Sequence, residues 1–89
     1  MENRVRVRPL PAGPFREGWE VRWRGKILDI DFADQSATAD LPAGIPVEVQ
    51  SDEWLYLGVL QERHMAQVSI EVEHCLERSQ IESIREVWG

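Results

Sequence analysis

The stretch Ile27-Leu28-Asp29-Ile30-Asp31-Phe32 alternates apolar and acidic residues, and this alternation decides the fold class. Because successive side chains of a β-strand point to opposite faces, Leu28, Ile30 and Phe32 share one face. We expect that face to be buried and the two aspartates to be solvated.

The same two-residue period extends to both sides of this stretch. Before it, Trp19-Glu20-Val21-Arg22-Trp23-Arg24 predicts a strand with Trp19, Val21 and Trp23 on the core face, and Gly25-Lys26 predicts the turn between the two strands. After it, residues 33–44 predict a loop. Further strands are predicted at residues 45–50, 54–60 and 68–72, with turns at 51–53 and 62–64.

The period changes at the C-terminus. Ser79 and Glu82 have the spacing of a capping box, and Ile81, Ile84 and Trp88 fall on one helical face. We therefore expect a mainly β protein in which five or six short antiparallel strands close into a small barrel, with one C-terminal α-helix that plugs one end or covers one face. The single domain, 1–89, would comprise a basic N-terminal arm (1–17), the barrel strands (18–76) and the terminal helix (79–88).

Charge is distributed unevenly along the chain. Residues 1–26 hold seven basic and three acidic residues, about +4, whereas residues 27–89 hold three basic and thirteen acidic residues, about −10. An acidic body repels duplex nucleic acid and anionic lipid, so neither is an expected partner. With a single cysteine, Cys75, and neither a signal peptide nor a long apolar run, the sequence indicates a cytoplasmic location.

The residues that catalysis or metal binding would need are sparse. His64 lies in a predicted turn, and His74 and Cys75 are adjacent at a strand end, without the pair spacing of zinc ligands or the context of an activated nucleophile. The aspartates at 29, 31 and 34 lack the glycine and the distal glutamate of a calcium loop. We expect neither an enzyme nor a metal or cofactor site.

Arg4, Arg6 and Arg8 are the candidate binding residues at the N-terminus. In an extended segment they share one face, opposite Val5 and Val7. The guanidinium fork recognises phosphate and guanine bidentately, which favours a site for a compact anion. Two alternatives remain: an edge strand whose charge blocks aggregation, or a terminus that pairs with the acidic body.

This layout resembles the PilZ family of bacterial cyclic di-GMP receptors. Arg4-Val5-Arg6-Val7-Arg8 matches the family's Arg-x-x-x-Arg motif, and Leu41-Pro42-Ala43-Gly44-Ile45-Pro46-Val47-Glu48-Val49 looks like its turn into the next strand. The segments 54–60 and 68–74 look like its last strands, and the resemblance covers most of residues 4–88. It implies a mainly β fold: a small antiparallel six-stranded (split) β-barrel with one C-terminal α-helix.

The family's second motif, Asp/Asn-x-Ser-x-x-Gly, fits in two registers. Asp34-Gln35-Ser36-Ala37-Thr38-Ala39 keeps the acid and the serine but has Ala39 in place of glycine. Asp29-Ile30-Asp31-Phe32-Ala33-Asp34 has the more natural position after a strand but lacks both the serine and the glycine. Layout favours the second register and ligand chemistry requires the first, so both stay open.

The resemblance implies a bacterial signalling protein that binds cyclic di-GMP and relays the signal to a partner protein. Arg4 and Arg8 would grip phosphate and guanine, Arg6 would steer the ligand, and Asp34 and Ser36 would contact the second guanine region. Two other functions are considered. One is a degenerate PilZ-like protein interaction module that binds no cyclic di-GMP, and the other is single-stranded nucleic acid binding through the basic N-terminal region.

Overall fold

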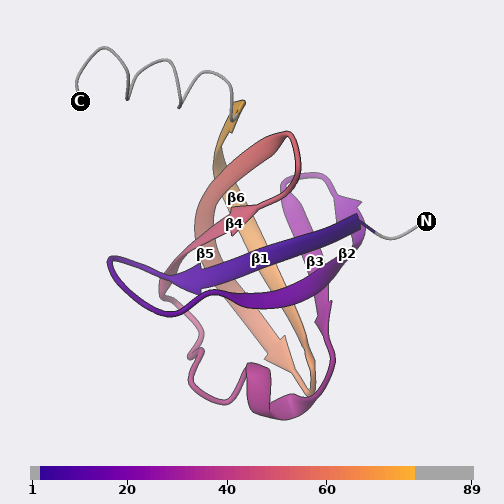
Figure 1. The fold of residues 1–89 in the computed structure, drawn as a ribbon, viewed down its shortest axis with the longest axis vertical. Coiled ribbons are helices and arrows are strands. Elements are labelled where there is room, and N and C mark those ends of the chain that lie inside the picture. Colours follow the sequence, from indigo (N-terminus) through magenta and orange to yellow (C-terminus); the bar gives the residue numbers. More distant parts are fainter. Residues whose placement is uncertain (1–2, 78–89) are drawn as a thin grey trace.

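The structure is a computed structural model that describes residues 3–77 (Figure 1). Its elements are six β-strands and one short 3-10 turn: β1 (Asn3–Pro9), β2 (Arg16–Arg24), β3 (Ile27–Phe32), η1 (Gln35–Ala37), β4 (Pro46–Gln50), β5 (Trp54–His64) and β6 (Gln67–Glu77). No helix within residues 3–77 is long and apolar enough to cross a membrane.

The six strands form one closed antiparallel barrel in the order β1-β2-β3-β6-β5-β4, and β4 pairs with β1 to close the ring. The prediction of a mainly β, six-stranded antiparallel barrel is therefore confirmed. The predicted terminal helix, 79–88, lies outside the described residues.

The N-terminal segment differs from the expected arm. Asn3–Pro9 is itself a barrel strand, which pairs with β2 on one side and with β4 on the other. Val5 and Val7 face the interior and are almost completely buried, so the alternation of valine and arginine fits a strand with one face in the core. This strand covers edges of β2 and β4 that would otherwise offer unpaired backbone groups.

The barrel interior is filled by aliphatic side chains and a few aromatic ones. Leu41 reaches this core from the loop between β3 and β4, and the hydroxyl of Thr38 in the same loop donates to the carbonyl oxygen of Met65 at 2.9 Å. This end of the barrel, where the β1–β2, β3–β4 and β5–β6 connections lie, is called the closed end. The core residues are Val5, Val7, Leu28, Ile30, Phe32, Leu41, Val47, Val49, Tyr56, Leu60, Val68 and Ile70.

The opposite end is called the mouth. It is formed by the start of β1, the β2–β3 turn, the β4–β5 turn and the end of β6. The β4–β5 turn was correctly predicted at residues 51–53, and Ser51 and Trp54 hold it through mutual hydrogen bonds of 2.9 and 3.1 Å. The turn predicted at 62–64 is wrong, because β5 continues to His64 and the chain reverses at Met65, whose φ is 56°.

A β-bulge in β2 overturns the prediction that Trp19, Val21 and Trp23 share a core face. The register with β3 shifts between Glu20 and Arg22, which leaves Val21 as the extra residue. Trp19 lies opposite Asp31, whereas Trp23 lies opposite the buried Leu28, so the bulge separates the two indoles onto different faces. Val21 and Trp23 are 36% and 41% exposed.

The bulge also brings Arg22 opposite Asp29, which was expected to be solvated and is instead fully buried. Its carboxylate accepts hydrogen bonds from Arg24 Nε and Nη2, both at 2.9 Å, from Arg22 Nε at 2.7 Å and from Ser69 Oγ at 2.7 Å. The hydrogen bonds from Arg24, aided by those from Arg22 and Ser69, hold the pKa of Asp29 well below its usual range.

We predict that Asp29→Asn lowers the free energy of unfolding by about 2 kcal/mol at neutral pH, because an amide cannot replace the charge-assisted hydrogen bonds. A carboxyl group whose pKa is depressed in the folded state stabilises the protein above the ordinary aspartate pKa, and this contribution is lost as the pH falls below it. Urea unfolding at pH 7 and below pH 4 measures this effect. The difference in free energy of unfolding between Asp29→Asn and wild type should be smaller in acid.

Asp31→Asn is the matched control on the same strand, since Asp31 is half-buried and accepts from Gln67 Nε2 at 2.8 Å. It should cost no more than about 1 kcal/mol. Equal losses in the two variants would contradict the structural role given to the Asp29 cluster.

A second prediction concerns Gly58 in β5, where a Cβ atom would overlap the backbone carbonyl of Glu71 on β6. Gly58→Ala should lower the free energy of unfolding by roughly 1–3 kcal/mol, because two paired backbones would have to separate. The control is Gly25→Ala, where an added Cβ atom meets no atom within 4 Å. Only the backbone φ of +63° is unfavourable for alanine there, so this variant should lose about 1 kcal/mol in free energy of unfolding. Thermal or urea unfolding measures both variants. A smaller loss of stability for Gly58→Ala than for Gly25→Ala would refute the close approach of the β5 and β6 backbones at Gly58.

Candidate functional site

The three candidate arginines lie on the outer face of β1, on a rigid wall of the barrel. Arg8 Nη2 donates to Glu48 Oε1 of β4 at 3.0 Å, and Arg6 Nη2 donates to Gln50 Oε1 of the same strand at 2.9 Å. The strand register explains both contacts, because Arg8 lies opposite Glu48 and Arg6 opposite Gln50. Arg4 lies nearest the mouth and is exposed.

Phe15, from the β1–β2 connection, packs against two of these arginines. The guanidinium carbons of Arg6 and Arg8 lie 5.1 and 4.8 Å from the centre of its ring, within the range of cation–π contacts. The ring and the β4 side chains together fix both guanidinium groups against the barrel.

Glu48 is the residue that most constrains Arg8. Its side chain is only 9% exposed, and its second carboxylate oxygen accepts a hydrogen bond from Gln50 Nε2 at 2.8 Å. A carboxylate with so little solvent access needs a cation beside it, so Arg8 balances the charge of its neighbour.

Asp34 and Ser36 lie in the loop between β3 and β4, at the closed end. Asp34 caps η1: its carboxylate accepts from the backbone N–H of Ser36 at 2.7 Å and also from the Ser36 hydroxyl. These hydrogen bonds, that from the hydroxyl first, lower the pKa of Asp34. The two residues that the first register of the second motif assigns to a ligand therefore bind each other.

The predicted site residues thus fall into two groups that have different partners. Strand β2 lies between β1, which carries the arginines, and β3, which leads into the loop of Asp34 and Ser36. Two arginines bind this loop. Arg16 of β2 donates to the Ala37 carbonyl oxygen at 2.7 Å and forms an ion pair with Asp40. Arg63 of β5 donates to the carbonyl oxygens of Thr38 and Ala39 at 2.8 and 3.1 Å. No sequence signal distinguished Arg16, because its partners are more than twenty positions away.

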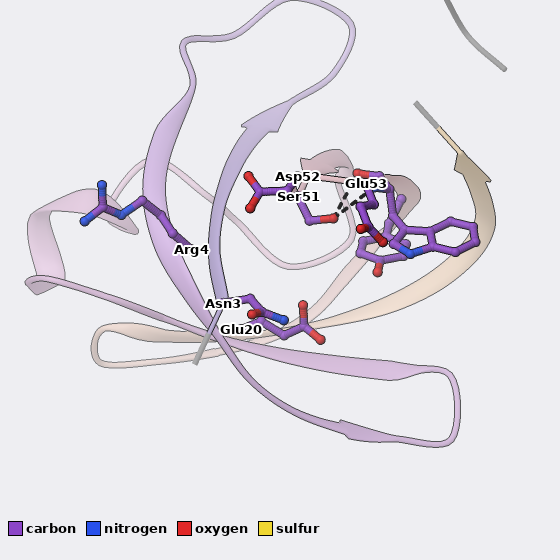
Figure 2. Close-up of a pocket in the computed structure, with 8 residues that line it drawn as sticks. Asn3, Arg4, Glu20, Ser51, Asp52 and Glu53 are labelled. Carbon is purple, nitrogen blue, oxygen red and sulfur yellow. Dashed lines mark hydrogen bonds between the residues drawn. The ribbon is translucent and has the colours of Figure 1, made fainter. Parts of the chain in front are cut away.

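A hollow lies at the mouth and has a volume of about 390 Å³ (Figure 2). A neighbouring hollow of about 320 Å³ lies against β1 and the end of β4, and Arg4 lines both. Of the predicted site residues, Arg4 alone lines the larger hollow and Arg4 and Arg6 line the smaller. The larger hollow is lined by Asn3, Arg4, Glu20, Ser51, Asp52, Glu53, Trp54 and Tyr56.

The other residues of the larger hollow were missed by sequence reasoning. They come from β1, β2, the β4–β5 turn and β5, and only the closed barrel brings these segments together. Within residues 3–77 there is no group of three or more histidine, cysteine or acidic side chains that could hold a metal ion. His64, His74 and Cys75 are exposed on β5 and β6.

No protein-family model, no curated protein and no solved structure matches the chain. Its function therefore has to be inferred from its own residues and their geometry.

We predict different structural roles for the two arginines of the Arg-x-x-x-Arg motif. Arg8→Ala should lower the free energy of unfolding by roughly 1–3 kcal/mol, because it removes the cation beside the poorly solvated Glu48. Arg4→Ala should change it by about 0.5 kcal/mol or less, as exposed substitutions usually do. Urea unfolding of the two variants under one buffer condition measures the difference, and equal effects would show that Arg8 does not support the wall.

Proposed function

We propose that this protein is a PilZ-like, non-enzymatic interaction module that binds a partner protein without requiring cyclic di-GMP. The observation that carries the proposal is the ion pair between Arg8 and Glu48, at 3.0 Å. In the resemblance Arg8 is one of the two arginines that grip the ligand, and in this chain its guanidinium already serves a carboxylate of the barrel wall.

The energetics favour the module over the receptor. Two arginines holding a ligand would supply about 3–6 kcal/mol, at roughly 1.5–3 kcal/mol for each hydrogen-bonded charge. A micromolar complex needs about 8 kcal/mol. If Arg8 left Glu48 to reach a ligand, the ion pair with Glu48 would be lost, so the net gain from Arg8 would be smaller still.

The second half of the ligand site also supports the module. Asp34 and Ser36 satisfy each other by hydrogen bonds, and the Asp34 carboxylate, like that of an ordinary aspartate, is ionised at neutral pH. An ionised carboxylate repels a phosphate group. Binding cyclic di-GMP here would require this turn to open first.

Several features suit a protein partner. The barrel is closed, and three exposed apolar side chains lie in the parts of β2, β5 and β6 nearest the mouth: Trp23, Trp54 and Leu76, at 41%, 36% and 39% exposure. Aromatic side chains are enriched at protein interfaces. The single exposed cysteine, Cys75, suits a reducing compartment, and we infer a cytoplasmic location.

One observation favours the receptor as a second candidate: Arg4 is exposed and lines both hollows. A ligand could reach Arg4 without any change in the barrel. Arg4 alone would contribute about 1.5–3 kcal/mol, which is too little for a micromolar complex.

We predict that cyclic di-GMP gives no binding heat in isothermal titration calorimetry at about 100 μM protein, at low and at moderate salt. The reason is that the Kd of so weak a complex lies above the micromolar range. A saturable heat that Arg4→Ala combined with Arg8→Ala abolishes would overturn the proposal and establish the receptor. The same double variant should still bind a captured partner protein.

A further inference from the structure

We propose that the hollow at the mouth binds a basic side chain, arginine or lysine, of the partner protein. This inference rests on the proposed function, since it names the chemistry by which an interaction module would recognise its partner. Of the arginine motif, only Arg4 lines this hollow, and the Asp34–Ser36 turn takes no part in it.

The shape of the hollow fits a side chain. Its volume of about 390 Å³ is within the range of sites that hold small ligands, and its walls come from two neighbouring strands, a turn and a third strand. Because these walls belong to the closed barrel, the hollow is formed before a partner arrives. A preformed site loses little conformational entropy on binding.

The charges around the hollow favour a cation. Glu20 of β2 and Glu53 of the β4–β5 turn line it with two carboxylates, and Arg4 is the one basic side chain among the described residues that line it. Figure 2 shows the Arg4 guanidinium extending away from Glu20 and Glu53. The chain as a whole carries a net charge of −6, which adds attraction for a basic partner.

Aromatic side chains supply the apolar part of the site. Trp54 and Tyr56 line the hollow, and the ring of Trp23 meets that of Tyr56 edge to face, with 5.2 Å between their centres. The indole N–H of Trp23 donates to Glu20 Oε1 at 2.6 Å, which fixes the position of this carboxylate. Arginine and lysine match such a site, because an aliphatic stem packs on aromatic rings while the charged group meets carboxylates.

A long organic cation fits better than a metal ion. The carboxylates of Glu20 and Glu53 line one hollow, yet no described group of acidic, histidine or cysteine side chains is close enough to hold a metal. A metal ion needs several ligand oxygens at about 2.0–2.6 Å, whereas a guanidinium or ammonium group on a flexible stem can meet separated carboxylates.

The test is a titration of the full chain, labelled with nitrogen-15, with the peptides tri-arginine and tri-lysine, followed by NMR. We expect saturable shifts of the indole N–H signals of Trp23 and Trp54. Glu53→Gln should weaken binding roughly 2–5-fold, the effect of one partly exposed charge pair. Glu73→Gln, an exposed carboxylate on β6 outside the hollow, removes the same charge and should leave the affinity within about 1.5-fold of wild type, as expected for a distant, screened charge.

Three outcomes would overturn the inference. The first is the absence of a saturable shift with either basic peptide, and the second is an equal response to tri-glutamate. The third is equal weakening of peptide binding by Glu53→Gln and Glu73→Gln, which would indicate non-specific attraction to an acidic surface. A fourth concerns the chain itself: Arg78 follows Glu77, which pairs with Trp54. If Arg78→Ala strengthens peptide binding about tenfold or more, a gain of about 1.4 kcal/mol, this arginine occupies the mouth and a partner does not.

The result is separable from the test of the proposed function. If the peptides fail to bind while cyclic di-GMP gives no heat, the module proposal stands and only the basic side chain is refuted. If cyclic di-GMP binds and the Trp23 and Trp54 signals still respond to tri-arginine, the module proposal fails and the site at the mouth remains.

Discussion

Pairing of β1 with both β2 and β4 closes the barrel, and the other features of the molecule depend on that closure. The strand can close the ring because Val5 and Val7 enter the core while the arginines stay outside. A terminal segment that might have been a mobile, basic arm is thereby held on both sides by backbone hydrogen bonds. The arginines are consequently displayed on a fixed surface, where the neighbouring strand decides what each one contacts.

A local irregularity in β2 has effects at two places on the barrel. The extra residue at Val21 reverses the alternation of the strand, so that Arg22 comes to lie over Asp29 and Trp23 turns toward the mouth. The first change neutralises a fully buried carboxylate by two half-exposed arginines. The second places an indole beside Tyr56 and Glu20. One inserted residue thus contributes both to the stability of the outer wall and to the chemistry of the mouth.

The two ends of the barrel differ in what they can do. The closed end is filled by Leu41, and Asp34, Ser36 and Arg16 make internal contacts in or with its loop. The mouth keeps a hollow with carboxylates and aromatic rings around it. This asymmetry favours recognition of a cation at the mouth over the binding of an anion by the arginines, which the sequence pattern had suggested.

The sequence by itself determined the fold class and most of the strands, because the two-residue period of apolar side chains in β3 and β4 and the continuous apolar run in β5 are local properties of the chain. It also indicated that Arg4, Arg6 and Arg8 share a face. Only the tertiary structure decided that Asp29 is buried, that Glu48 binds Arg8 and that the residues of the mouth meet. These contacts join strands that are far apart in the chain or lie beyond a bulge, and no local pattern encodes which strand becomes the neighbour of another.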